Sequence, residues 1–251
     1  MMKGTFDGDI ALVTGAATGL GRTIAQHLAN AGANGLVFDI AEKCHDLPNG
    51  WTALQGDVSN EVDMANTVVE VSKRFGRLDI VVANAGLVPP WHDTENIDLE
   101  EWDHVFEVNV KGVIATIKHA VPLMKASGGS IVVMGSLNSH RAHPKQCLYT
   151  ASKHAVLGIV RAAALDLGRY GIRVNALGPG PVATDALVER IKIRAGKGEP
   201  PLEEVLKQFS ADAALRQMIS EDDVARAAVF LAGNGSDGIT GQLLPIDAGL
   251  P

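Results

Sequence analysis

A tyrosine and a lysine four residues apart, Tyr149 and Lys153, form the pair in this sequence best suited to proton transfer. On a helix, residues with this spacing lie on one face, one turn apart. A free tyrosine has a pKa of about 10, and a nearby cation favours the phenolate and moves that pKa toward neutrality. The pair is therefore a candidate general acid/base. Ordinary neighbours on a partly solvated helix have the same spacing, so the rest of the chain must decide between the two interpretations.

A glycine-rich turn after the first apolar run is a candidate phosphate-binding site. Residues 10–14 are followed by Gly15, Gly19 and Gly21 in the spacing G-x-x-x-G-x-G, and then by a helical pattern. Glycines between a strand and a helix let the backbone approach a pyrophosphate at the helix N-terminus. The spacing differs from the commoner G-x-G-x-x-G, so the position of the turn in the chain carries this prediction.

Polar and small residues follow the next predicted strands, where the rest of a nucleotide would lie. The second strand ends at Asp39, 24 residues after Gly15. A carboxylate there can accept hydrogen bonds from an adenosine ribose and repels a 2′-phosphate, which favours NAD over NADP. Ordinary turn chemistry is the alternative at each strand end. Two further strand ends, near 54–56 and at 83, are followed by Asp57, Val58, Asn84, Ala85 and Gly86.

The order of the predicted elements indicates an α/β fold: a Rossmann-type doubly wound parallel sheet in three layers, α/β/α. Apolar runs with little polar alternation are typical of strands buried on both faces. No repeat or linker divides the chain, so residues 1–251 are expected to form one domain, with a mobile substrate lid around 185–217. The predicted strands are 10–14, 35–38, 80–83, 130–134, 173–177 and 243–246, and the predicted helices are 22–31, 61–75, 99–125, 151–170 and 222–232.

Composition and charge argue against several classes of function. The formal net charge of −7 argues against nucleic acid or an anionic membrane as the main partner. The short polar segment before the first strand is not a signal peptide, and no apolar run reaches the roughly 18 residues of a membrane span. Two isolated cysteines fit a cytoplasmic protein, and Cys147 is predicted to be an apolar filler rather than a nucleophile. His140 and His143 lack the spacing of metal ligands, so no metal site is expected.

Taken together, these residues resemble the short-chain dehydrogenase/reductase family over about residues 10–249. Ser136 stands 13 residues before Tyr149, as is usual in that family. Departures occur at Ala83, Gly135 and Ala248, where the family often has Asn, Ser and Gly, and none touches the proposed proton chemistry. The motifs that carry the resemblance are the glycine turn after Thr14, Asn84-Ala85-Gly86, Asn109, Ser136, Tyr149-x-x-x-Lys153 and Pro179-Gly180.

The resemblance implies hydride transfer between a nicotinamide cofactor, NAD, and a small-molecule secondary alcohol or ketone. Tyr149 would be the general acid/base, and Lys153 would lower its pKa and hold the nicotinamide ribose. Ser136 would bind the substrate oxygen, and Asn109 would hold a relay water behind Lys153. A homo-oligomer is also implied, most often a tetramer, packed through the helices at 99–125 and 151–170. The implied cofactor contacts are Gly15, Thr18, Gly19, Leu20, Asp39, Ile40, Asp57, Val58, Asn84, Ala85, Gly86, Tyr149, Lys153, Pro179, Gly180, Val182 and Thr184.

Substrate choice is expected to depend on residues 87–94, 137–148 and 185–217. Trp91 and His92 either face the substrate or form an exposed loop pair. Beside Ser136 and Tyr149, the predicted substrate contacts are Asn138, His143 and Gln146. The leading prediction is a cyclic alcohol, polyol or sugar-like substrate, although the lid itself indicates neither a sugar nor an acyl chain.

Two alternatives remain open at this point. The first is a 3-oxoacyl-[acyl-carrier-protein] reductase that uses NADPH and docks an acidic carrier protein through arginines. Asp39 counts against it, as do Ser127 and Tyr170 at the corresponding docking positions. The second is a non-catalytic NAD-binding sensor or structural subunit on the same fold, since fold alone does not establish function. Such a protein would be expected to lack Tyr149 or Lys153, and this chain keeps both.

Overall fold

Parallel strands form one seven-stranded sheet in the computed structural model, which describes residues 5–42, 44, 46–196, 198 and 200–250. The strand order is β3-β2-β1-β4-β5-β6-β7, so the chain builds one half of the sheet outward from β1 and the other half outward from β4. The predicted Rossmann-type doubly wound fold is confirmed. The strands are β1 (Ile10–Thr14), β2 (Asn34–Asp39), β3 (Thr52–Gln55), β4 (Ile80–Ala83), β5 (Gly129–Met134), β6 (Ile172–Pro179) and β7 (Leu243–Ile246).

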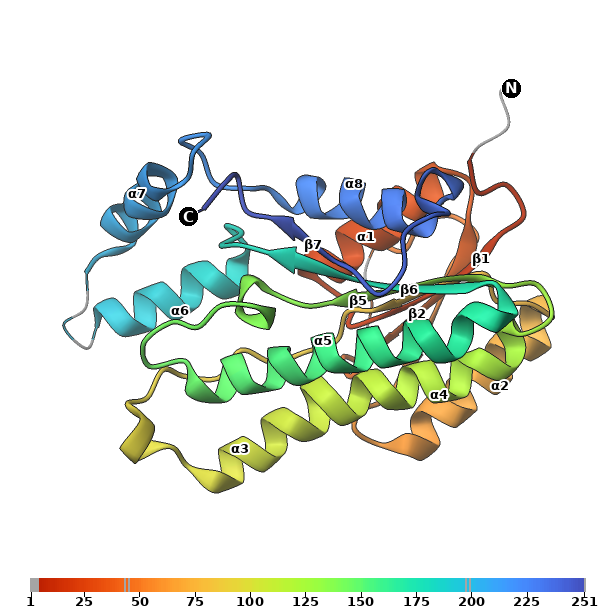
Figure 1. Ribbon diagram of the computed structural model, residues 1–251, viewed down its shortest axis with the longest axis horizontal. Helices are drawn as coiled ribbons and strands as arrows, with labels where there is room; N and C mark the ends of the chain where they lie inside the picture. Colours follow the sequence, from red (N-terminus) through yellow and green to blue (C-terminus); the bar gives the residue numbers. More distant parts are fainter. Residues whose placement is uncertain (1–4, 43, 45, 197, 199, 251) are drawn as a thin grey trace.

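Helices cover both faces of the sheet and complete three layers (Figure 1). On one face, α1 (Gly19–Asn30) and α8 (Glu221–Ala232) pack against each other and enclose a core that includes Val13 and Ile24. On the other face, α2 (Glu61–Phe75), α4 (Gly112–Met124) and α5 (Cys147–Leu167) enclose a core that includes Leu12 and Met64. Because neighbouring strand residues point to opposite faces, each central strand contributes to both cores.

The helix predicted over 61–75 has the same bounds in the structure because both of its ends are specified locally. Asn60 caps the N-terminus: its side chain accepts a hydrogen bond from the backbone N–H of Val62 at 3.0 Å. Gly76 ends the helix in the left-handed region, with φ of 71°. The helices predicted at 22–31 and 151–170 begin earlier than expected, at Gly19 and Cys147, so the last glycines of the turn and Tyr149 lie within helices.

The long helix predicted over 99–125 is interrupted. It consists of α3 (Leu99–Phe106), a π-helical turn (Glu107–Lys111) and α4. Asn109 lies in the π-helical turn, which agrees with its poor helix propensity. Such turns occur frequently at functional sites, and this one lies between two helices on the face that carries α5.

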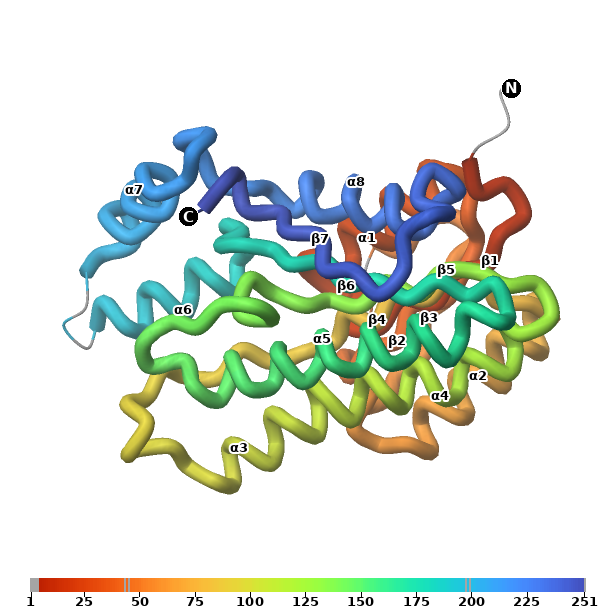
Figure 2. Tube along the Cα trace, in the orientation of Figure 1, coloured from red at the N-terminus to blue at the C-terminus, as the bar shows by residue number. Residues whose placement is uncertain are grey.

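The segment predicted as a lid contains two helices, α6 (Asp185–Ala195) and α7 (Leu202–Asp212). Figure 2 shows both helices beyond the sheet, at the end where β5, β6 and β7 finish and where α5 begins. Ile191 is buried and anchors α6. That the segment moves stays a prediction. Within the described ranges, no helix is long and apolar enough to cross a bilayer.

Candidate active site

The glycine turn lies at the carboxyl end of β1, and two of its glycines contact neighbouring backbone so closely that a side chain would not fit there. A Cβ atom on Gly15 would lie 2.6 Å from the Cα of Ala85, and one on Gly21 would lie 2.2 Å from the carbonyl oxygen of Gly15. Gly19 begins α1 with φ of 55°, in the left-handed region. The first N–H groups of α1 have no intrahelical acceptor. That the turn binds a pyrophosphate group stays a prediction.

Asn84 holds the glycine turn in place from the neighbouring strand, β4. Its side-chain amide donates to the carbonyl oxygens of Thr14 and Gly15, at 3.0 and 2.8 Å. The Thr14 hydroxyl accepts from the backbone N–H groups of Asn84 and Ala85, both at 3.1 Å. The Asn84 amide is thus directed at the protein, and its effect on a bound cofactor would act through the shape of the turn.

Asp39 stands at the end of β2, next to the same turn. One carboxylate oxygen accepts from the backbone N–H of Ala17 at 2.8 Å and the other from Ala41 at 3.0 Å. Each oxygen keeps acceptor capacity, because a carboxylate offers about four lone pairs. A fixed negative charge therefore lies beside the turn, where a ribose can donate hydrogen bonds and a 2′-phosphate would be repelled.

The remaining predicted cofactor residues lie along the carboxyl edge of the sheet or at the start of the helices that follow it. Thr18 is the N-cap residue of α1, and Leu20 is in its first turn. The Thr184 hydroxyl caps α6 by accepting from the N–H of Leu187 at 3.2 Å. Asp57 accepts from the N–H of Ser59 at 2.8 Å. Ile40 is largely exposed, whereas Val58 and Val182 are buried; Pro179 ends β6, and Gly180 follows it.

Ser136, Tyr149 and Lys153 come together at the carboxyl end of β5. Tyr149 is in the first turn of α5 and makes a side-chain hydrogen bond with Ser136, which follows β5 directly. Lys153 lies one turn further along α5, and its Nζ is 5.8 Å from the centre of the Tyr149 ring. Lys153 is buried, and its Nζ donates to the carbonyl oxygen of Met134 at 2.8 Å. The arrangement contains an acid/base group, a hydroxyl for a substrate oxygen and a cation.

The electrostatics of this group differ in one respect from the sequence prediction. Burial raises the pKa of Tyr149, whereas its hydrogen bond with Ser136 and the charge of Arg190 lower it, and the net direction is upward. Burial lowers the pKa of Lys153 to about 8. That Lys153 lowers the Tyr149 pKa stays a prediction, since the charge that acts on Tyr149 in this structure is that of Arg190. Desolvation outweighs the nearby charge for Tyr149, and it is the cause of the shift for Lys153.

Asn109 connects the Tyr149 helix with the chain that follows the Asn84-Ala85-Gly86 turn. Its side-chain oxygen accepts from the N–H of Leu87 at 2.7 Å, and its amide donates to the Leu87 carbonyl at 2.9 Å. The same amide donates to Ser152 at 3.3 Å, and Ser152 donates to the carbonyl oxygen of Tyr149 at 2.8 Å. Asn109 is completely buried, so these bonds have no competition from solvent. That it holds a relay water stays a prediction.

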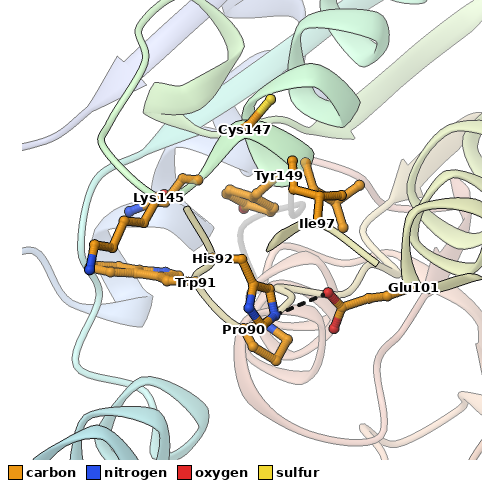
Figure 3. Close-up of a pocket in the computed structure, with 10 residues that line it drawn as sticks. Pro90, Trp91, His92, Ile97, Glu101, Lys145, Cys147 and Tyr149 are labelled. Atoms are coloured by element: carbon orange, nitrogen blue, oxygen red, sulfur yellow. Dashed lines mark ion pairs between the residues drawn. The ribbon is translucent and has the colours of Figure 1, made fainter. Parts of the chain in front are cut away.

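A hollow beside Tyr149 is the candidate substrate site (Figure 3). Trp91 and His92 line it, and Trp91 is 38% exposed. That they face a substrate stays a prediction. His92 lies 3.4 Å from the carboxylate of Glu101, which sequence reasoning missed. Across from these residues, the guanidinium of Arg194 on α6 lies 3.7 Å from the centre of the Trp91 ring. The lining residues are Pro90, Trp91, His92, Ile97, Glu101, Lys145, Gln146, Cys147, Leu148 and Tyr149.

The predicted substrate contacts near Tyr149 differ in their positions. Gln146 lines the hollow, whereas His143 is exposed and is not among the lining residues. Asn138 is buried, and its amide donates to Gln146 at 3.0 Å and to Thr150 at 2.9 Å, so it braces the loop. Cys147 is exposed and lines the hollow, so the prediction that it fills an apolar core is wrong. The reason is its position as the first residue of α5, where its side chain is exposed. The described residues contain no metal-binding cluster of His, Cys, Asp or Glu side chains.

Comparison with known proteins gives matches over nearly the whole chain. The family model described as enoyl-(acyl carrier protein) reductase matches residues 15–251. An uncharacterized oxidoreductase of Thermotoga maritima is 34% identical over 97% of this chain and 98% of its own. Xanthoxin dehydrogenase of Arabidopsis thaliana is 37% identical over 96% of this chain and 89% of its own. The crystal structure of carveol dehydrogenase from Mycobacterium avium in complex with NAD has a TM-score of 0.90 and 31% identity, and the match covers 98% of both chains.

Proposed function

The chain belongs to the short-chain dehydrogenase/reductase family of NAD(P)-dependent oxidoreductases, and we propose that it transfers a hydride between NAD and a secondary alcohol or the corresponding ketone. The observation that carries the proposal is the convergence of Ser136, Tyr149 and Lys153 beside the hollow. An acid/base phenol, a hydroxyl donor and a cation within one small site are the groups that alcohol oxidation requires from the protein.

In the proposed reaction, the Tyr149 phenolate takes the proton of the substrate hydroxyl, and in reverse the neutral phenol gives its proton to a carbonyl oxygen. The Ser136 hydroxyl, hydrogen-bonded to Tyr149, holds the substrate oxygen near the phenol. Lys153, with a pKa of about 8, exchanges its own proton readily near neutral pH, and its charge favours the phenolate when present. Bound nicotinamide would supply the hydride acceptor, held by the glycine turn, Asp39 and Lys153.

Preference for NAD over NADP is supported by the orientation of Asp39. The backbone N–H groups of Ala17 and Ala41 fix its carboxylate in the turn that would receive the adenosine ribose. A 2′-phosphate carries about two negative charges at neutral pH and would meet this carboxylate directly. The same carboxylate can accept hydrogen bonds from the hydroxyls of an unphosphorylated ribose.

A homo-oligomer packed through α4 and α5 is part of the proposal. Ile114 on α4 and Leu165 on α5 are exposed apolar side chains, at 44% and 86%. Exposed apolar residues on adjacent helices favour association. Light scattering at micromolar concentration is expected to give a multiple of the 26.4 kDa chain mass, and a monomer would contradict this part of the proposal.

One observation keeps the carrier-protein reductase as a second candidate. Lys125 Nζ and the Arg169 guanidinium both lie 4.8 Å from the centre of the Tyr170 ring. Two cations therefore flank the position where the sequence alone predicted only an uncharged Tyr170. A cationic patch can attract an acidic partner, although Asp39 still counts against NADPH.

The proposed function is tested by measuring NADH formation from NAD and NADPH formation from NADP in parallel. The substrate panel contains secondary alcohols, cyclic diols, polyols, hydroxy acids and hydroxyacyl thioesters. NAD-linked turnover of an alcohol is the expected result. Turnover with NADP and a hydroxyacyl thioester alone would replace the proposal with the carrier-protein reductase. Tight NADH binding without any turnover would point to a nucleotide sensor.

A further inference from the structure

Arg190, on α6, is a half-buried cation close to the candidate acid/base. Its charge is near enough to Tyr149 to lower the pKa of the phenol, and Tyr149 and Arg194 are its electrostatic neighbours. Among the residues that the structure describes, Arg190 forms no ion pair and no side-chain hydrogen bond. A charge removed from water without a partner is costly, so such an arrangement is uncommon unless a ligand completes it.

The neighbouring positions of α6 offer Arg190 no internal counter-ion. On a helix, residues three and four positions away share a face. Around Arg190 those positions are occupied by Ala186, Leu187, Ile193 and Arg194, and none of them is acidic. Arg194 repeats the positive charge one turn later, and like charges at this spacing destabilise a helix.

The helix face that carries Arg190 is turned toward the candidate substrate hollow. Arg194 stacks on Trp91, which lines that hollow together with Tyr149. Glu101 lies 3.4 Å from His92 and Asp93 lies 3.7 Å from Lys145, and no carboxylate among the described residues forms an ion pair with Arg190. The described acidic side chains of the hollow therefore leave the charge of Arg190 uncompensated.

We propose that Arg190 binds a carboxylate of the substrate, so that the enzyme acts on a secondary alcohol that carries an acid group, or on the corresponding oxo acid. A guanidinium matches a carboxylate with two parallel hydrogen bonds, which also fixes the orientation of the bound molecule. The carboxylate stays unchanged in the reaction: the carbinol carbon gives its hydride to NAD, and the hydroxyl gives its proton to the Tyr149 phenolate. This inference rests on the proposed function and narrows its substrate class.

A binding experiment tests the carboxylate contact without requiring turnover. Butanoate and benzoate are titrated into the enzyme saturated with NADH, beside the uncharged butanamide and benzamide. The wild type is expected to bind each carboxylate on the order of 10- to 100-fold more tightly than its amide, the range of a charge-assisted pair. Arg190→Gln is expected to abolish this difference. Equal affinity of the wild type for acid and amide, or a preference that survives in Arg190→Gln, would overturn the proposal.

Two further variants separate this contact from general effects of the lid. Lys192→Gln removes the same charge from an exposed position of α6 and is expected to keep the preference for carboxylates. Arg190→Lys keeps the charge without the planar fork, and is expected to keep part of the preference. Thermal unfolding of each variant identifies any loss of folding. If Lys192→Gln lowered the carboxylate preference as much as Arg190→Gln, the general charge of α6 would be responsible and the specific contact would be refuted.

Kinetics with matched substrates distinguish failure of this inference from failure of the proposed function. Carboxylic acids with a secondary hydroxyl group at carbon 2, 3 or 4 are each compared with their methyl esters, with NAD as the hydride acceptor. The acid is expected to have the lower KM, and Arg190→Gln is expected to raise the KM for the acid alone. A fall in kcat for acid and ester alike, with a shifted pH profile, would mean that Arg190 acts on Tyr149 and not on a carboxylate. Carboxylate binding through Arg190 without turnover of any alcohol would support the contact and refute the oxidoreductase mechanism.

Discussion

Replacing Lys153 by Met is predicted to stabilise the cofactor-free protein at neutral pH while removing a group of the proposed active site. Lys153 is 4% exposed, and burial lowers its pKa from 10.5 to about 8. The folded protein therefore binds fewer protons than the unfolded chain between pH 8 and pH 10.5, and its stability rises with pH across that window. Below it, both states carry the charge, and the folded state bears the full cost of burying it.

The size of the effect follows from the shift in the pKa of Lys153. A shift of the pKa from 10.5 to about 8 means that burying the charged lysine lowers the free energy of unfolding by about 3 kcal/mol near neutral pH. Of this penalty, about 2 kcal/mol disappears between about pH 6.5 and about pH 9.5. The substitution also leaves the Met134 carbonyl oxygen without its 2.8 Å donor, which costs about 1 kcal/mol. Lys153→Met should thus be more stable than the wild type by about 2 kcal/mol at the lower pH and nearly equal to it at the higher pH.

The assay is urea unfolding of both proteins, stripped of cofactor, at several pH values across this range. Other titrating groups largely cancel in the difference between the two proteins, and Tyr149 stays neutral because its pKa is raised. A pH-independent difference would refute the argument that Lys153 is buried with a depressed pKa. So would a wild type that is the more stable protein by several kcal/mol at the lower pH.

Three further predictions concern the cofactor turn and its support. Asp39→Asn keeps an acceptor for the turn but removes the charge. It should raise the ratio of kcat/KM for NADP over NAD by about tenfold or more. An unchanged ratio would exclude Asp39 as the residue that selects NAD. Gly21→Ala places a Cβ 2.2 Å from a carbonyl oxygen and should abolish tight NADH binding. The control is Gly158→Ala, which has open space around it and should leave binding intact. Equal NADH affinities of the two variants would contradict this prediction. Asn109→Ala leaves the buried N–H and carbonyl of Leu87 without partners and should lower the free energy of unfolding by roughly 2–3 kcal/mol. If urea unfolding shows a loss of stability smaller than the precision of the assay, these bonds are dispensable.

The fold was predictable because its signals are local. The strands at 10–14 and 80–83 are short apolar runs, which is typical of buried strands. The helix at 61–75 has a capping Asn60 and a terminating Gly76. The spacing of Ser136 and Tyr149, which matches the family motif, implied that the two side chains meet, and the structure brings them together.

Other properties of the site depend on packing between distant elements and left no local signal. Whether Asn138 faces a substrate or braces Gln146 depends on the path of the loop, and the structure gives the second answer. Glu101 reaches the hollow from α3 and Arg190 approaches Tyr149 from α6, so neither could be assigned to the site from spacing. The direction of the Tyr149 pKa follows from the extent of burial, which a tyrosine and lysine pattern does not contain.

The most direct test of the proposed mechanism is Tyr149→Phe. The substitution removes one oxygen atom and keeps the ring that packs at the start of α5. Turnover of any substrate identified with the wild type is expected to fall by two to four orders of magnitude, roughly the contribution of general acid–base catalysis, while NADH affinity stays within about threefold. Turnover close to that of the wild type, with NADH still bound, would contradict the assignment of Tyr149 as the acid/base.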